Sequence, residues 1–91
     1  MTTPVAADAC PRVSRRFRLQ WEDAQNAWVL LYPEGMVKLN QSAGEILRRC
    51  DGSRTVSAIV ADLEQAFGAS GLADDVAKFL ELARAQQWVE L

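Results

Sequence analysis

The stretch YPEGMVKLNQSAGEIL, residues 32–47, decides the fold of this chain. Before it, apolar residues alternate with the period of two that is typical of strands, and after it they recur at helical spacings of three and four. Within it, Pro33 suits the second position of a turn and Gly35 the fourth. A short strand at 36–39 follows, and Ser42, with a glutamate three residues later, begins a capping-box pattern. The stretch therefore joins a small sheet to a helical bundle.

Upstream of this stretch the pattern predicts two more strands. In residues 17–22 every second residue is apolar, which indicates a half-buried strand. A polar loop at 23–26 leads to AWVLLY at 27–32, which is apolar on both faces. Short loops between consecutive strands favour an antiparallel meander with 27–32 in the centre and 36–39 at an edge. One face of the central strand must cover the helices, and the other is either shielded by the N-terminal arm or offered to another chain.

Downstream, helical periodicity predicts three helices. The first runs from Ser42 to Cys50, the second from about Thr55 to Phe67, and the third from Ala73 to Gln87. Residues 88–91 are expected to fold back over the core. The predicted fold class is α+β: a three-stranded antiparallel sheet followed by a three-helix bundle, in a winged-helix-like arrangement.

Length, charge and composition narrow the class of protein. The 91 residues suit one domain, with residues 1–13 as a flexible N-terminal arm and residues 14–91 as the domain. A net charge of −2 offers no general attraction for nucleic acid. The sequence has no apolar run of membrane-spanning length and no signal-peptide pattern, so the expected location is cytoplasmic.

The residues that usually carry catalysis are scarce. The chain has no histidine, and its two cysteines, Cys10 and Cys50, lack a metal or redox spacing. Cys50 falls on the apolar face of the first helix, where a thiol behaves as a small hydrophobe. Asp74 and Asp75 are adjacent on a helix and so point in different directions. We therefore expect no enzymatic activity, no cofactor and no metal.

A binding role is the stronger prediction. An edge strand offers unpaired backbone groups to which an extended peptide can add. If the third helix packs beside that edge, a groove forms with an apolar wall and charged side chains, although the same helix flank also suits ordinary boundary residues. The candidate peptide-binding residues are Met36, Val37, Lys38, Leu39, Asp75, Lys78, Phe79 and Leu82.

Two alternatives and one assembly state remain open. The alternatives are a winged-helix-type nucleic-acid-binding domain and a generic protein-interaction domain. The former is disfavoured because residues 56–67 contain no Lys or Arg. A homodimer is a hypothesis based on the doubly apolar strand at 27–32; sedimentation showing only monomer at high concentration would remove it.

Several short motifs together resemble the PqqD family of pyrroloquinoline quinone (PQQ) biosynthesis, over about Pro11 to Leu91. The matching residues, in order, are Pro33-Glu34-Gly35, Leu39-Asn40, Ser42-Ala43, Ile46-Leu47, Cys50-Asp51-Gly52, Arg54-Thr55, Ile59, Leu63, Asp75-Val76 and Phe79-Leu80. Each motif is weak alone, but their order and spacing are specific. The arm through Cys10 has no clear counterpart in the family.

The resemblance implies a fold of three strands followed by three helices without enzymatic activity. It implies binding of the ribosomal precursor peptide PqqA and its presentation to the radical SAM enzyme PqqE, which joins a Glu and a Tyr side chain of that peptide. The iron–sulfur clusters and SAM belong to that partner enzyme. In related domains the peptide pairs with the third strand and lies against the third helix, which corresponds here to residues 36–39 and to the flank from Asp75 to Leu82.

Overall fold

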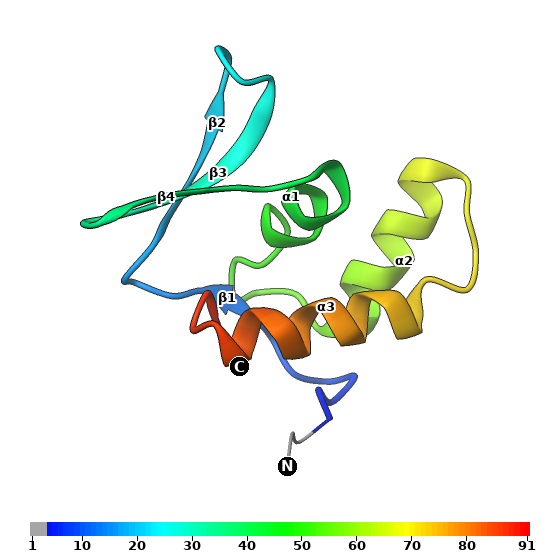
Figure 1. Ribbon diagram of the computed structural model, residues 1–91. Coiled ribbons are helices and arrows are strands. Elements are labelled where there is room, and N and C mark those ends of the chain that lie inside the picture. The colour runs from blue at the N-terminus through cyan, green and yellow to red at the C-terminus, as the bar shows by residue number, and fades with distance from the viewer. Residues whose placement is uncertain (1–3) are drawn as a thin grey trace.

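The computed structural model describes residues 4–91 and has the expected α+β architecture. Its main sheet contains β2 (Arg18–Glu22), β3 (Ala27–Tyr32) and β4 (Gly35–Lys38) in the antiparallel order β2-β3-β4. The predicted meander is confirmed, with β3 central and β4 at an edge. Figure 1 shows this sheet on one side of the molecule, α2 and α3 on the other, and α1 between them.

The first helix begins one residue before the predicted Ser42, since α1 spans Gln41–Leu47 and Asn40 is its N-cap. The Asn40 side chain accepts a hydrogen bond of 2.8 Å from the Ala43 N–H. The expected capping box is therefore wrong. Asn caps a helix as well as Ser does, and Asn40 already has the extended backbone that a cap requires.

The two later helices follow the prediction closely. The second helix, α2, spans Val56–Phe67, with Thr55 as a side-chain N-cap and Gly68 in the left-handed conformation at its end (φ 60°). The third, α3, spans Ala73–Ala85 and stops two residues before the predicted Gln87. Gln87 has a φ of 65°, and the next N–H, that of Trp88, donates to the Ala83 carbonyl. This is the Schellman arrangement, which turns the chain back toward the core.

One face of the sheet and the inward faces of the helices form a single core. The register pairs Leu19 with Leu30 and Leu30 with Val37, so the apolar side of all three strands faces the helices. The core cluster is Leu30, Leu39, Ala43, Ile46, Leu47, Cys50, Val56, Ile59, Leu63, Val76, Leu80, Ala83 and Val89. Cys50 is buried, as its position on the apolar face predicts.

The packing of α1 on the sheet depends on Gly44. A Cβ at this position would lie 2.7 Å from Cδ1 of Trp28 on β3. Because such a separation is far inside van der Waals contact, only glycine allows the helix to approach the indole this closely. Trp21 packs against Trp28 in a T-shaped arrangement with ring centroids 5.6 Å apart, and the Arg48 guanidinium lies 6.0 Å from the Trp28 ring centroid.

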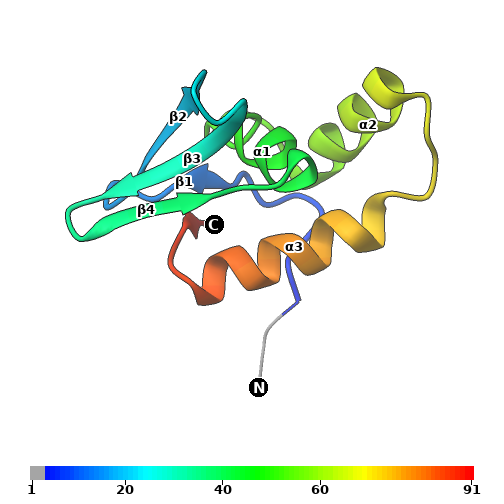
Figure 2. The ribbon, with the colours of Figure 1, turned by 45° about the horizontal axis from the view of Figure 1, so that its top comes forward.

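A second, two-stranded sheet joins the chain ends and was not predicted. It pairs β1 (Arg12–Val13) antiparallel with β5 (Val89–Glu90). The residues expected to form a free arm are also engaged: the Ala9 and Ala7 carbonyls accept from the first N–H groups of α2. Residues 1–3 of the expected arm lie outside the described residues. Figure 2 shows this N-terminal segment passing beside α3 rather than over the outer face of the main sheet.

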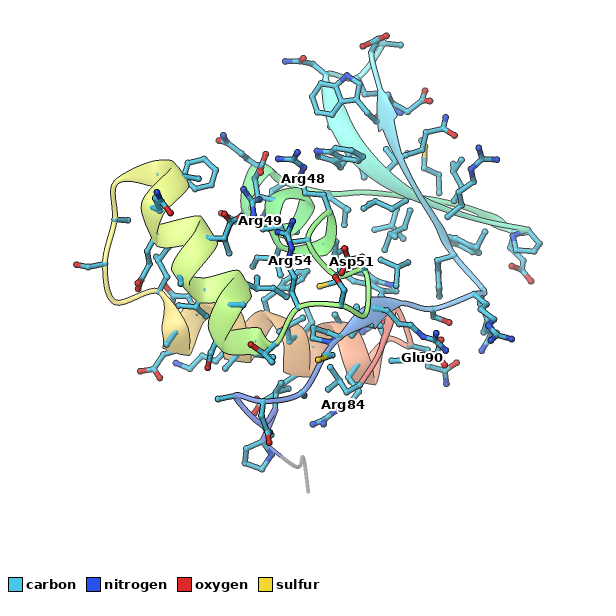
Figure 3. All side chains as sticks on the ribbon, turned by 180° about the vertical axis from the view of Figure 1, so that it is seen from behind. Arg48, Arg49, Asp51, Arg54, Arg84 and Glu90 are labelled. Carbon is cyan, nitrogen blue, oxygen red and sulfur yellow. The ribbon has the colours of Figure 1, made fainter. Side chains whose placement is uncertain are left out.

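An ion-pair network fixes α1 to α2. The Arg49 side chain, almost fully buried, contacts Asp62 Oδ2 through Nε at 2.5 Å and Glu45 Oε1 through Nη1 at 2.8 Å. Arg48 and Arg54 add pairs to the same two carboxylates, and Figure 3 shows the three arginines gathered where the two helices meet. The Arg49 hydrogen bonds hold the pKa values of Glu45 and Asp62 below their usual range.

Candidate peptide-binding site

The free edge of β4 exposes the backbone groups of alternate residues. The Leu39 N–H donates to the Trp28 carbonyl at 3.0 Å, which marks these two residues as a hydrogen-bonded pair. Hydrogen-bonded pairs alternate along an antiparallel ladder, so the next such pair contains Val37. Met36 and Lys38 therefore direct both N–H and C=O away from β3, and residues 4–91 supply no hydrogen bond to these groups.

The side chains of β4 divide between the two faces of the sheet. Val37 packs on the core and Leu39 is buried, so these two residues hold the strand in place. Met36 is 44% exposed and Lys38 is exposed. They lie on the outer face, where Met36 Sδ contacts Gln25 Nε2 at 3.7 Å. Of the four candidate residues at 36–39, Met36 and Lys38 are the two whose backbone groups can face an added strand.

The four candidate residues on α3 share one flank of the helix. Val76, Leu80 and Ala83 form its buried stripe. Asp75, Lys78 and Leu82 are exposed beside that stripe, and Phe79 is half-buried against the core. Leu82 is 51% exposed, which is unusual for a leucine beside a core stripe. The helix therefore presents one exposed apolar side chain on the same flank as an acidic and a basic residue.

The two halves of the candidate site, β4 and α3, are held in place by different neighbouring elements. β4 pairs with β3, whereas α3 packs mainly against α2 and β5. Both Figure 1 and Figure 2 show α3 below β4 with no other helix between them. α3 and β4 make few or no direct contacts, so the structure does not close the groove that the sequence led us to expect between them.

A pocket lies where this region meets α1, and sequence patterns did not identify it. Its volume is about 280 Å³, and its lining includes Gln41 and Ser42 of α1, Phe67 of α2 and Asp75 of α3. Periodicity places Phe67 on the buried face of α2, yet its side chain is 51% exposed. The one sequence signal for this exposure was the position of Phe67 as the last residue before Gly68, at the end of α2.

The site carries no evident catalytic or metal-binding group. Within residues 4–91 no three His, Cys, Asp or Glu side chains are placed to hold a metal ion. Burial raises the pKa of Cys50 to about 12, and its thiol donates to the Ile46 carbonyl. Such a thiol is inert as a nucleophile near neutral pH. No helix in this part of the chain is long and apolar enough to span a bilayer.

Comparison with known proteins identifies the family to which this chain is similar. Residues 27–89 match the family model described as coenzyme PQQ synthesis protein D (PqqD). A relative from Azotobacter vinelandii, named PqqA binding protein, is 57% identical over 82 residues, which cover 89% of each chain. A Pseudomonas aeruginosa protein of the same name is 56% identical over 85 residues, covering 92% of each.

Two solved structures share the fold. The solution structure of the PqqD part of Methylobacterium extorquens PqqCD, described as a functional stand-alone recognition element for ribosomally synthesised and modified peptides, matches with a TM-score of 0.80 at 30% identity. The match covers 98% of this chain and 97% of that one. The crystal structure of PqqD from Xanthomonas campestris matches with a TM-score of 0.58 at 29% identity, covering 96% and 99%.

Proposed function

Because this chain belongs to the PqqD family, we propose that it binds the precursor peptide PqqA and presents it to the radical SAM enzyme PqqE in PQQ biosynthesis. The family is a non-catalytic recognition element. Its relatives that match nearly the whole of this chain are named PqqA binding proteins. Nothing in the chemistry of the site calls for an enzymatic role.

The observation that carries the proposal is the unpaired edge of β4. Met36 and Lys38 together offer two N–H donors and two C=O acceptors along the free edge of the sheet. An extended peptide can add to such an edge as a further strand, and its main chain then supplies affinity independent of its sequence. The added strand would extend the sheet on the side where α3 lies.

The flank of α3 formed by Asp75, Lys78, Phe79 and Leu82 would determine the specificity for the peptide. Leu82 and Phe79 provide apolar surface that a peptide side chain can cover. Asp75 and Lys78 place two opposite charges on the same flank, one turn or more before Leu82, which favours a peptide with complementary charges in one register. β4 would thus supply the backbone pairing, and α3 would supply the specificity for peptide side chains.

Binding by strand addition leaves the rest of a long peptide outside the complex. Residues beyond the paired stretch stay accessible, so a second protein can act on them while this chain holds the peptide. Presentation to PqqE requires that the two proteins and the peptide form one complex. Gel filtration of the chain with PqqE, with and without PqqA, tests this; failure of the three to co-elute would contradict presentation while leaving peptide binding intact.

An amide-shift titration tests peptide capture itself. Adding PqqA peptide to ¹⁵N-labelled protein should shift the amides of Met36 and Lys38 and of the α3 flank around Leu82. Shifts that spare both β4 and the Phe79 flank would rule out the proposed site.

A substitution at Leu82 tests whether this residue contributes to peptide binding or to the stability of the core. Leu82→Asp should weaken peptide binding and leave the fold intact, because the leucine is largely solvated. Leu91→Asp is the matched control, since Leu91 is similarly exposed but lies at the C-terminus outside the site. Equal affinities for the two variants would remove Leu82 from the site.

A further inference from the structure

The pocket between α1, α2 and α3 is lined both by core residues and by the exposed side chain of Phe67. Its apolar walls are formed by Ile46, Leu63, Phe67, Leu72 and Val76. We propose that it binds one apolar side chain of the PqqA peptide, beyond the stretch that pairs with β4, and that this side chain is adjacent to a basic residue. This inference rests on the proposed function and adds a second anchor to it.

The pocket shares residues with, or follows closely in the chain, both halves of the proposed peptide-binding site. After Lys38, the chain passes through two residues and reaches Gln41, which already lines the pocket. On the opposite wall Asp75 belongs to both the pocket and the α3 flank. The anchoring side chain is therefore expected in the part of the peptide beyond the residue that lies opposite Lys38.

The size of the pocket selects a side chain rather than a cofactor. Small-molecule sites in proteins occupy roughly 300–1,000 Å³. A volume of about 280 Å³ lies at the lower limit of that range and accommodates a single large apolar side chain. Phe67 is 51% exposed at the pocket wall and would lose much of that exposure when a peptide side chain enters.

Charge determines what should flank the apolar side chain. The ionisable lining residues are Glu45 and Asp75, and no Lys or Arg lines the pocket. Glu45 is already paired with two arginines of its own helix. Asp75 forms no ion pair within residues 4–91, so its carboxylate is available to a ligand cation. A Lys or Arg beside the apolar anchor would complement it.

The test compares Phe67→Ser with Trp21→Ser by calorimetric titration of PqqA peptide into each variant. Both residues are large, aromatic and partly exposed, at 51% and 42%, but Trp21 does not line this pocket. Phe67→Ser should weaken binding about tenfold, and Trp21→Ser should change it by less than about twofold. Ala69→Arg, in the exposed connection between α2 and α3, should also weaken binding by blocking the pocket.

The peptide side of the contact is tested by a double-mutant cycle. Each apolar residue of PqqA is replaced by alanine and titrated against the wild type and Phe67→Ser. One replacement should weaken binding to the wild type and have no further effect on Phe67→Ser. If neither Phe67→Ser nor Ala69→Arg changes affinity, the pocket is not used and the inference is overturned, while strand addition stands. If the wild type itself does not bind, the proposed function fails.

Discussion

Replacing Lys38 by proline tests whether the β4 edge binds a peptide through its backbone. The Lys38 N–H points away from β3, so proline removes a donor that the folded protein does not use. Proline is tolerated on an edge strand when the missing N–H faces solvent, and the preceding Val37 already has the extended backbone that proline requires. The variant should therefore fold.

The expected magnitude follows from the number of exposed groups. Met36 and Lys38 offer four backbone groups, and each hydrogen bond to a peptide contributes about 1 kcal/mol net. Lys38→Pro deletes the hydrogen bond from the N–H of residue 38. The proline ring also pushes the peptide backbone away from the carbonyl of the same residue, so two hydrogen bonds are lost. A loss of about 2 kcal/mol corresponds to about 30-fold weaker binding.

Calorimetric titration with PqqA peptide measures this loss, and Lys38→Ala is the matched control. Alanine removes the same ammonium group but keeps the N–H, so it should weaken binding by no more than about fivefold, as expected for one exposed charge. Urea denaturation of each variant verifies that the fold is retained. A folded Lys38→Pro protein with wild-type affinity would refute strand addition at this edge. Equal losses for proline and alanine would assign the effect to the side chain instead.

Three further predictions concern stability and reactivity. Gly44→Ala should lower the free energy of unfolding in urea by about 1–2 kcal/mol, because the new Cβ clashes with Trp28 by more than the improved helix propensity compensates; unchanged stability would show that α1 can shift. Burial raises the pKa of Cys50 to about 12, so this thiol should react with a thiol reagent only when the protein unfolds, whereas the exposed Cys10 should react at once. The hydrogen bond from Arg49 lowers the pKa of Glu45, so the stability that this pair contributes is present above the unfolded pKa of about 4.3 and is lost as pH falls through the folded pKa. The free energy of unfolding should therefore fall less steeply with acid in Arg49→Met than in the wild type. An identical slope in the two proteins would contradict the pairing.

The candidate site was predicted from sequence in part. The edge position of residues 36–39 follows from loop lengths, and the exposure of Leu82 beside a buried stripe follows from helical periodicity. Which backbone groups point outward required the register between β3 and β4, because a slip of one residue would exchange Met36 and Lys38 for their neighbours. The pocket at Phe67 required the relative placement of three helices.

The sequence by itself determined what depends on neighbouring residues. The period of two before residue 32, the helical period after residue 42, and local signals such as Pro33 and Gly68 specify the elements and their order. These signals act within one strand or one turn of helix, so they can be read without knowing the rest of the fold.

Tertiary structure decided what depends on residues far apart in the chain. Two-residue strands such as β1 and β5 have no periodicity of their own and exist because they pair with each other. Glycine is required at position 44 because the Trp28 indole on β3 lies close by. Arg49 can be buried because a carboxylate on α2, that of Asp62, pairs with it. Each of these contacts forms only after the intervening chain has packed, which local patterns cannot specify. The outward backbone groups of Met36 and Lys38 remain unpaired for the same reason: no other strand within residues 4–91 pairs with that edge.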